Sequence, residues 1–293
     1  MHQSDTTTPC PFNTEFYARG LSNIGEVEMD PTFRIPVLRR PITGTTLSDG
    51  VGPWPYLWIE NDSDIEKLYV NFRHLVTLSV VTQPGYIPKA QGGDAKLLKQ
   101  HYVYDPSLPR RPLSRRARER LLRCEARATF EVVSDEHQRM EIIGLYEGLK
   151  HRRGLNGGLF DYGVRHFKTI SQLKDGIFFR VLDDRGVGAI ACGVVFSGML
   201  QVLHTVISEY GLRWNASYLL MHGLQDYAHA HRLRLLTGGM PDAGADGLRT
   251  FKERWANSFT PVYLLRIIND RPRYADLCSG KSRDGYFPAY RQK

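Results

Sequence analysis

The sequence predicts a mixed α/β protein in which a largely antiparallel sheet is flanked by helices. The second half of the chain carries this prediction. Two tight-turn sequences, Asp183-Asp184-Arg185-Gly186 and Ser197-Gly198, separate apolar runs of strand length. A helical pattern follows at about 214–230. Strands in a meander, then a helix and a further strand, build a mixed sheet. The expected strands of this half lie at 128–133, 176–182, 187–196, 199–207, 233–237 and 261–268.

The remaining elements follow from apolar spacing and capping residues. Ser114 can cap a helix over 115–127. Residues 1–50 are rich in Pro, Thr, Gly and Asp and show little periodicity, and 84–113 is a second polar, Pro-rich stretch in which no strand is predicted. Further helices are expected at 62–76, 135–152, 161–173 and 246–256, and a strand at 77–83. The chain is divided into an irregular arm (1–40), a first half (41–127), a second half (128–278) and a tail (279–293).

The composition is that of a packed, basic protein. Of 293 residues, 42% are hydrophobic and 24% are charged, which argues against long disorder. The formal net charge of +8 favours an anionic partner such as nucleic acid or a phosphorylated cofactor. The four cysteines are widely spaced, so neither a zinc ribbon nor a disulfide framework is predicted.

One uncharged stretch, 186–207, is long enough to cross a bilayer. Its glycines, its β-branched residues and the break at Ser197-Gly198 favour two buried strands instead. The polar N-terminus lacks the apolar segment of a signal peptide. We therefore expect a cytoplasmic protein that does not enter the membrane.

Several motifs that would indicate other chemistry are rejected. Gly186-x-Gly188-x-x-Ala191 matches a dinucleotide pattern in form, but these glycines lead into a strand and not into a helix. The helical residues His222, His229 and His231 lack an acidic partner, and two of them point to different sides, so no metal site is predicted. GxSxG, HExxH and Walker sequences do not occur, which leaves hydrolase, metalloprotease and NTPase functions without support.

Residues 109–127 contain eight arginines. Four of them recur at helical spacing and form a cationic face, while Ala117, Leu121 and Cys124 occupy another side of the same helix. Two interpretations are equally weighted: a solvated surface partly neutralised by acidic neighbours, or a face that contacts phosphates of RNA or of a nucleotide-linked substrate. The four arginines of this face are Arg116, Arg120, Arg123 and Arg127.

The run from Leu200 to Leu265 resembles the C-terminal half of Fem-like proteins, which belong to the GNAT acyltransferase superfamily. In that family a strand leads to a Gly-Gly pair, and a segment with the pattern gl..FK..w precedes the last strand. The matching residues are Gly238-Gly239, the run Gly247–Lys252 and Trp255.

Two further segments extend the resemblance. Residues 142–170 are similar to the family's Tyr-containing helix and its aromatic-rich continuation, and 284–291 is similar to its ending. The likeness is good over 128–291 and faint over 40–127, where it rests on the sequence SDGVGPWPYL.

The resemblance implies a tandem GNAT-like fold, with two halves and mixed, largely antiparallel sheets flanked by helices. It also implies transfer of an amino acid from aminoacyl-tRNA to an amine, with formation of a peptide bond. The lysine of the FK pair is thought to stabilise the charge on the ester carbonyl, so Lys252 is the expected catalytic residue. Phe251 would help to shape the pocket for the tRNA end.

The expected aminoacyl transfer is also reasonable on chemical grounds, without the family resemblance. An activated ester needs an oriented amine and a donor near the oxyanion, but no nucleophilic side chain. Lys252 follows glycines that let the backbone approach a substrate closely. His204 is a second catalytic candidate, as a relay or an orienting group, although a hydrogen-bonded core histidine is an equal alternative. The expected substrate-end contacts are Phe251, Arg249, Tyr146, Gly238 and Gly239.

The donor is chosen between aminoacyl-tRNA and acyl-CoA. Residues 209–220 supply a single glycine before the helix, whereas a pyrophosphate loop needs several small residues. This deficit and the arginine face favour tRNA as the partner, with no cofactor and no metal. An acyl-CoA-dependent N-acyltransferase is the first alternative, and a non-catalytic RNA- or nucleotide-binding protein is the second. A small amine or peptide is the expected acceptor, because no coiled-coil insertion is visible.

Overall fold

The structure, a computed structural model, describes residues 9–292 apart from 31, 33, 90–93, 242–243 and 282–284. The chain forms two compact units. Met1–Leu98 and Val262–Lys293 make up the first unit, and Lys99–Pro261 makes up the second. These units differ from the expected halves, because the segment after Lys99 packs with the second unit and the last strand returns to the first.

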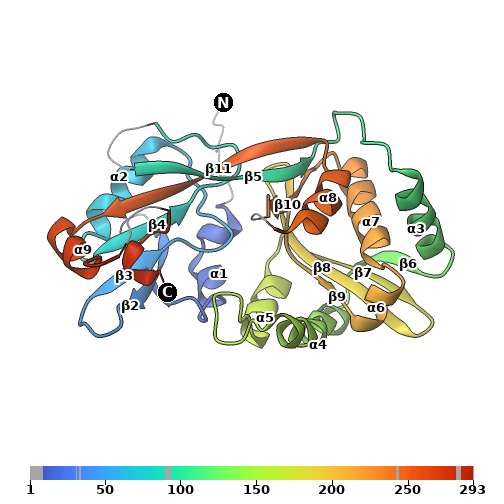
Figure 1. The fold of residues 1–293 in the computed structure, drawn as a ribbon, viewed down its shortest axis with the longest axis horizontal. Helices are drawn as coiled ribbons and strands as arrows, with labels where there is room; N and C mark the ends of the chain where they lie inside the picture. The colour runs from blue at the N-terminus through green and yellow to red at the C-terminus, as the bar shows by residue number, and fades with distance from the viewer. Residues whose placement is uncertain are drawn as a thin grey trace, which may run out of the picture. The chain divides into compact units, whose positions relative to one another are not determined.

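The second unit contains a mixed sheet in the order β5-β10-β9-β8-β7-β6 (Figure 1). Neighbouring strands are antiparallel except β9 and β10, which are parallel. The uncharged stretch 186–207 forms β8 and β9, joined by Ser197 and Gly198 with φ of 49° and 70°. The strands are β5 (Asp94–Tyr104), β6 (Thr129–Val133), β7 (Gly176–Asp183), β8 (Gly186–Phe196), β9 (Met199–Ile207) and β10 (Arg234–Gly239).

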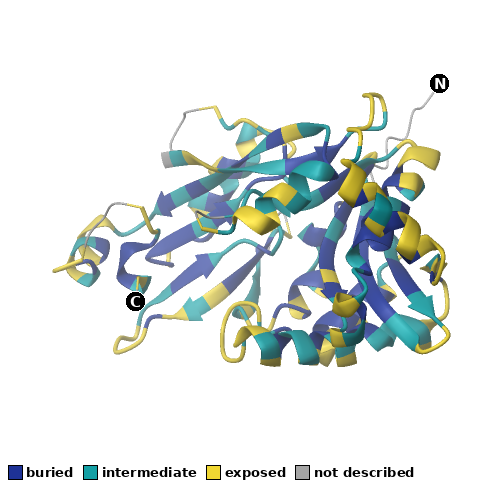
Figure 2. Cartoon of the chain, turned by 45° about the vertical axis from the view of Figure 1, so that its right-hand side comes forward, coloured by how far each residue is buried: buried dark blue, intermediate teal, exposed yellow. Residues whose placement is uncertain are grey.

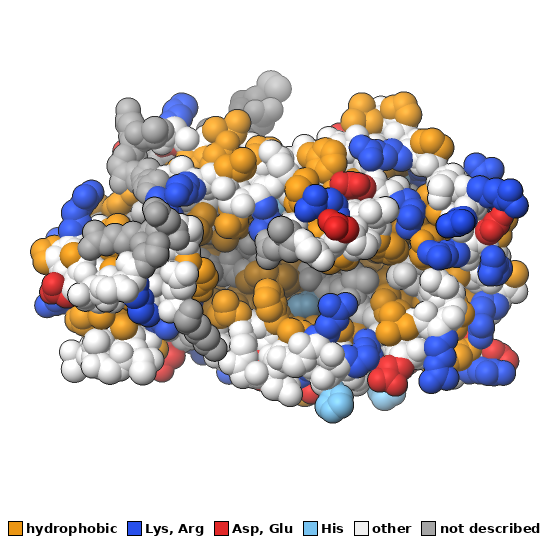
Figure 3. Space-filling view, viewed as in Figure 1, with side chains coloured by type: hydrophobic (Ala, Val, Ile, Leu, Met, Phe, Trp, Pro, Cys, Tyr) orange, Lys and Arg blue, Asp and Glu red, His pale blue; other side chains and the backbone are white. Residues whose placement is uncertain are grey.

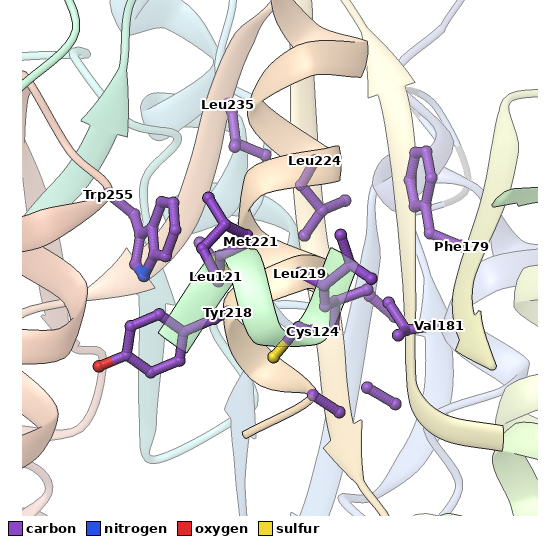
Figure 4. Packing of buried hydrophobic residues seen from close by; sticks show 14 of the residues in the cluster. Leu121, Cys124, Phe179, Val181, Tyr218, Leu219, Met221, Leu224, Leu235 and Trp255 are labelled. Atoms are coloured by element: carbon purple, nitrogen blue, oxygen red, sulfur yellow. The ribbon is translucent and has the colours of Figure 1, made fainter. Parts of the chain in front are cut away.

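Helices cover both faces of this sheet. On one face α7 lies against the strands and α3 packs on α7, so that Leu121 and Cys124 of α3 share a core with Phe179 and Val181 of β7 (Figure 4). On the other face lie α4 and α5, where Arg180 of β7 binds Glu141 of α4. The helices are α3 (Arg115–Glu125), α4 (Glu136–Arg153), α5 (Val164–Gln172), α6 (Glu209–Arg213), α7 (Ser217–Ala230) and α8 (Asp246–Arg254).

The first unit contains a sheet in the order β1-β2-β3-β4-β11, with α2 packed on one face. Asn61 and Asp64 form a capping box that starts α2. Apolar residues of α2 and of strands β4 and β11 are buried together (Figure 2). The elements are η1 (Pro11–Asn13), α1 (Glu15–Arg19), β1 (Glu26–Met29), β2 (Pro36–Pro41), β3 (Ser48–Val51), α2 (Asp62–Asn71), β4 (Thr77–Val81), β11 (Ser258–Ile268), α9 (Arg271–Leu277) and η2 (Ala289–Arg291).

Two expectations about local structure are wrong. The residues expected to form an irregular arm contain η1, α1, β1 and most of β2, because Phe12 and Tyr17 are buried and anchor them. The Pro-rich stretch 84–113 contains the long strand β5. The helix expected at 214–230 is confirmed as α7, which begins at Ser217, because Asn215 has a left-handed φ of 63° and separates it from the short helix α6. The other expected strands and helices of residues 128–268 are confirmed, with small shifts at their ends.

The mixed α/β fold class is therefore confirmed, with helices on the faces of mixed sheets. Among the described helices, none combines the length and the apolar composition that a membrane span requires.

Candidate active site

The end of β10 is shaped by a bulge that contains a left-handed glycine. Its pairing with β5 joins Leu236 to Val103 and Gly239 to His101, so β10 has one residue more than its partner. Gly238 lies in this bulge with a φ of 87°, a conformation that a residue with a Cβ adopts only with strain. The predicted Gly238-Gly239 pair thus marks an irregular strand end.

Lys252 reaches this strand end from α8. Its Nζ donates hydrogen bonds to the carbonyl oxygens of Thr237 and Gly239, both at 3.0 Å. A Cβ on Gly238 would lie 3.4 Å from the same Nζ, so the ammonium group sits directly against the bulge. An ammonium group has three N–H donors. Two are occupied within the described part of the chain, no described residue accepts a hydrogen bond from the third, and the ammonium group lies 5.9 Å from the centre of the Tyr102 ring.

The surroundings of Lys252 are cationic. Burial and the nearby charge of Lys99 lower the pKa of Lys252 to about 8. Burial, Lys99 and Lys252 lower the pKa of His101 to about 4, so this imidazole is neutral at pH 7. Neither lysine forms an ion pair with any described residue. A half-buried ammonium group without a carboxylate is suited to an anion or to an oxygen that becomes negative during reaction.

Strand β5 supplies the residues of this site that the sequence did not reveal. The stem of Lys99 lies over Gly239, where a Cβ would come within 2.0 Å of Lys99 Cδ. Gly239 therefore leaves the space that the Lys99 stem occupies. The Nδ1 of His101 is buried without a hydrogen-bond partner in the described structure. The run YVY at 102–104, which has high strand propensity, was the available signal.

The parallel pairing of β9 and β10 ends next to this site. It joins three residue pairs, the last being Leu236 with Gln201, although both strands continue. Beyond that pair, β9 has a bulge at Leu203, and Thr205 is exposed in mid-strand. Ligands of open α/β sheets bind outside the carboxyl ends of parallel strands. This is the end at which Lys252 meets β10.

The second catalytic candidate, His204, lies in a separate buried cluster with Tyr146. Its Nε2 is 2.7 Å from Nε2 of His166, and the two imidazoles are 7% and 1% exposed. Burial, with a smaller contribution from His166, lowers the pKa of His204 well below its ordinary value. Tyr146 packs edge-on against His204 at 5.4 Å between ring centroids and donates to the carbonyl oxygen of Phe160. Lys252 does not contact this cluster. The roles assigned to His204 and Tyr146 stay predictions.

The two other predicted site residues on α8, Phe251 and Arg249, differ in their contacts. Phe251 is half-buried and packs on Tyr218 and Trp255, with ring centroids 5.8 Å and 6.3 Å away. It holds α8 on the core. Arg249 is also half-buried, and its Nε has no hydrogen-bond partner among the described residues. Burial raises the pKa of Tyr102, and the charge of Arg249 opposes that rise, so Arg249 lies near this part of β5.

The four arginines of the predicted cationic face are all exposed, but they differ in their contacts. Arg127 binds the carboxylate of Asp183 at 2.7 Å and the hydroxyl of Tyr210, which gives it a structural role. Arg120 donates to the hydroxyl of Tyr218 at 3.0 Å. Arg123 lies 4.0 Å from a carboxylate oxygen of Glu119, and no contact is found for Arg116 within the described structure.

The glycines of the rejected dinucleotide pattern serve packing. A Cβ on Gly188 would lie 2.3 Å from the ring of Trp214, and one on Gly211 would lie 1.9 Å from the carbonyl oxygen of Gly188. The N–H of Gly211 donates to Oγ of Ser208, the N-cap of α6. No group of three or more described His, Cys, Asp or Glu side chains is arranged to hold a metal ion.

The first unit contains a cavity of about 490 Å³ that is lined by charges of both signs. Its lining includes Arg34, Lys67, Glu60 and Asp64, and Lys67 binds Asp64 at 2.8 Å. Asn13 joins its wall to the backbone of Trp58 by two hydrogen bonds. None of the predicted site residues lines this cavity.

Comparison with known proteins identifies the fold. No protein-family model matches the chain, and no curated protein matches its sequence. A crystal structure of FemX matches with a TM-score of 0.62 at 12% identity, over 89% of this chain and 92% of that one. The C-terminal domain of a putative lysylphosphatidylglycerol synthetase from Agrobacterium fabrum matches with a TM-score of 0.60 at 14% identity, over 91% and 92%. L-PGS from Bacillus licheniformis matches with a TM-score of 0.59 at 12% identity, over 87% and 88%. The chain therefore shares the fold of FemX and of these two proteins.

Proposed function

We propose that the protein is an acyltransferase that moves an aminoacyl group from aminoacyl-tRNA to the amine of a small molecule or peptide. One observation carries the proposal. The ammonium group of Lys252 is held by two backbone carbonyls at the carboxyl end of β10, with a free N–H donor and no ion-pair partner among the described residues. The structural likeness to FemX and to the two lysylphosphatidylglycerol synthetases supports the same class of reaction.

The reaction needs no covalent enzyme intermediate. The acceptor nitrogen attacks the ester carbonyl, a C–N bond forms, and the C–O bond to the ribose of tRNA breaks. The proton lost by the amine ends on the released ribose hydroxyl. Negative charge develops on the carbonyl oxygen, and we assign the third N–H of Lys252 to donate to it. A single donor of this kind typically changes kcat by about 10²–10³-fold.

The neighbouring residues would orient the ester. Arg249 lies one turn before Lys252 on α8, and residues three apart share a helix face. We assign Arg249 to the phosphate or sugar at the tRNA end. Gly238 and Gly239 present backbone without side chains beside the ammonium group, which leaves room for the ester. Phe251 contributes by fixing α8 on Tyr218 and Trp255.

The segment between β9 and α7 favours an RNA donor over acyl-CoA. A pyrophosphate nest requires backbone N–H groups that converge on open space. Here the N–H of Gly211 is bound by the side chain of Ser208. Gly211 itself is packed against the backbone of Gly188. The small residues of this segment therefore serve packing.

The donor is tested by supplying each candidate with the same set of amines. The full-length protein is incubated with radiolabelled aminoacyl-tRNA or with acetyl-CoA, and amide product, uncharged tRNA and free thiol are measured. We expect amide formation that depends on tRNA and is abolished by ribonuclease. Release of thiol from acetyl-CoA without RNA would contradict the proposal.

The lysine is tested by Lys252→Met, which keeps the length of the side chain and removes its charge. We expect kcat/KM to fall by about 10²–10³-fold, with little change in RNA affinity. Lys168→Met is the matched control, because Lys168 is an exposed lysine on α5 in the same unit. Equal turnover in both variants would rule out the catalytic role and favour a protein that only binds RNA.

A further inference from the structure

Two guanidinium groups converge on a single tyrosine hydroxyl at the edge of the second unit. Arg120 of α3 donates to the hydroxyl of Tyr218 at 3.0 Å, and Arg254 of α8 donates to the same oxygen at 2.8 Å. The two guanidinium carbons lie 5.7 Å and 5.3 Å from the centre of the tyrosine ring. Of these residues, only Arg120 was predicted to contact phosphate, and it was predicted from helical spacing alone.

The hydrogen bonds of this cluster leave donors without acceptors. A phenol oxygen has two lone pairs and one O–H hydrogen. Both lone pairs of Tyr218 accept from arginines, so its O–H must donate elsewhere, and no described residue accepts it. Each guanidinium group has five N–H donors, of which one is used here. The two guanidinium groups and the Tyr218 hydroxyl therefore all offer hydrogen-bond donors in one place, and none of the three carries a negative charge.

The charges of the cluster are also unbalanced. Neither Arg120 nor Arg254 has an ion-pair partner among the residues that the structure describes. The nearest acidic residue of α3, Glu119, is bound to Arg115 at 2.9 Å. A third guanidinium group, that of Arg111, lies 3.5 Å from the carbonyl oxygen of Glu253. Like charges held this close repel each other unless an anion lies between them.

The cluster is held rigidly by the apolar core. Tyr218 is only 4% exposed, and Phe251 and Trp255 pack edge-on against its ring at 5.8 Å and 6.0 Å. Figure 4 shows the Tyr218 hydroxyl pointing away from the buried apolar side chains. A fixed ring that places its hydroxyl at the edge of the core is a preorganised binding group.

We propose that Arg120, Tyr218 and Arg254 together bind one phosphate group. A phosphate offers several oxygens to two guanidinium groups and a hydroxyl, and charge-assisted bonds of this kind are the strong ones. Lys and Arg side chains gather over α3, the helix that carries Arg120 (Figure 3). Arg254 and Lys252 lie on the same helix, α8, but two residues apart and therefore on different sides of it. We assign the phosphate to the same RNA whose end reaches Lys252. This identity of the ligand rests on the proposed function, whereas the anion subsite does not.

The subsite is tested by RNA binding in the absence of transfer. The full-length protein is titrated into a labelled, uncharged RNA stem with a single-stranded 3′ end, and fluorescence anisotropy is read at constant ionic strength. Arg120→Gln and Arg254→Gln are expected to raise the Kd about fivefold or more, because each loses a charge-assisted phosphate contact. The control Arg118→Gln removes one exposed charge from the same helix and should raise it less than twofold.

Tyr218→Phe separates a built subsite from general electrostatic attraction, because it removes the hydroxyl and changes no charge. We expect it to raise the Kd about threefold, in line with the loss of one hydrogen bond and of the anchor for both arginines. Circular dichroism melting of each variant confirms that it is folded. If Tyr218→Phe and Arg254→Gln bind RNA like Arg118→Gln, the subsite is refuted.

A second titration distinguishes the source of the phosphate. ATP and inorganic pyrophosphate are tested as competitors, with sodium chloride matched to the same ionic strength. The RNA assignment is overturned if ATP binding depends on these residues and RNA binding does not. Aminoacyl transfer that proceeds normally in the Arg254→Gln variant would refute the subsite alone. RNA binding that depends on Arg120 and Arg254, without any aminoacyl transfer, would refute the proposed function but not the subsite.

Discussion

At the level of single residues, the structure explains how the surroundings of Lys252 set its pKa and fix its position. Burial and Lys99 favour the neutral form of Lys252, while two carbonyl oxygens hold its ammonium group in place. Its pKa of about 8 leaves it mostly charged at pH 7. The sequence could identify Lys252, Gly238 and Gly239 together because they lie within one short segment. Lys99 could not be placed beside them, because only the pairing of β5 with β10 brings it there.

The protonation state in which Lys252 acts can be determined from the pH dependence of kcat/KM, which reports the pKa values of the free enzyme. If the ammonium group stabilises the oxyanion, kcat/KM should fall as the pH rises through about 8, because the charge is lost. If Lys252 instead acted as a base, kcat/KM would rise over the same range. Two acceptor amines of different pKa identify the limb that belongs to the enzyme.

Lys99→Met tests whether Lys252 is the group that controls this pH profile. It removes a charge that lowers the pKa of Lys252, so the descending limb should move to higher pH. A limb that stays in place in this variant would show that another group controls it.

His204 shows what a sequence cannot supply at this scale. A lone histidine in a strand pattern is compatible with catalysis and with packing. The structure pairs it with His166, which is 38 residues away in the chain, inside a ring of aromatic side chains. The spacing of the two histidines follows from α5 packing on the sheet, which no local pattern encodes.

At the level of elements, periodicity predicted the regular parts and missed the irregular ones. The expected strands β7, β8 and β9 were placed to within about a residue, because burial on both faces of the sheet leaves continuous apolar runs bounded by tight turns. The short helix α6 was missed, because it has only five residues and is separated from α7 by Asn215, which is not a glycine, in the left-handed conformation. The arginine face of α3 is present, but tertiary contacts tie Arg127 to Asp183 and leave Arg116 exposed.

The bulge of β10 leads to a prediction about Gly238→Ala. A Cβ at a φ of 87° is strained, and it would also lie 3.4 Å from Nζ of Lys252. We expect a loss of about 1–2 kcal/mol in the free energy of unfolding, together with a fall in kcat from a displaced ammonium group. Chemical denaturation and steady-state kinetics measure the two effects.

Gly144→Ala is the matched control for this substitution. Gly144 is an exposed glycine within α4, and a Cβ there meets nothing within 4 Å. The same change should stabilise the helix by about 0.5–1 kcal/mol and leave kcat unchanged. If Gly238→Ala is as stable and active as wild type, the bulge does not position Lys252.

At the level of the whole molecule, the two units differ in which parts of the chain build their cores. The described buried residues that form the core of the second unit lie between Tyr104 and Trp255 in the sequence. The first unit combines strands from the beginning of the chain with β11 and the C-terminal residues. Its buried carboxylate, Asp49, is bound by Tyr290 and Arg291 from the far end of the chain. Local sequence patterns could not predict this return, because it depends on contacts across more than 200 positions.

This difference predicts the behaviour of two fragments. Residues 99–261 contain a complete core, so they should unfold cooperatively by circular dichroism and near-ultraviolet signals. Residues 1–98 lack β11 and two of the three described partners of Asp49, and of these only Arg40 remains to bind that buried carboxylate, so they should remain unfolded. Because Lys99, Lys252 and the phosphate subsite all lie within 99–261, the folded fragment should retain RNA binding that is sensitive to Arg254→Gln. A fragment 99–261 without a cooperative transition would show that its core depends on the first unit.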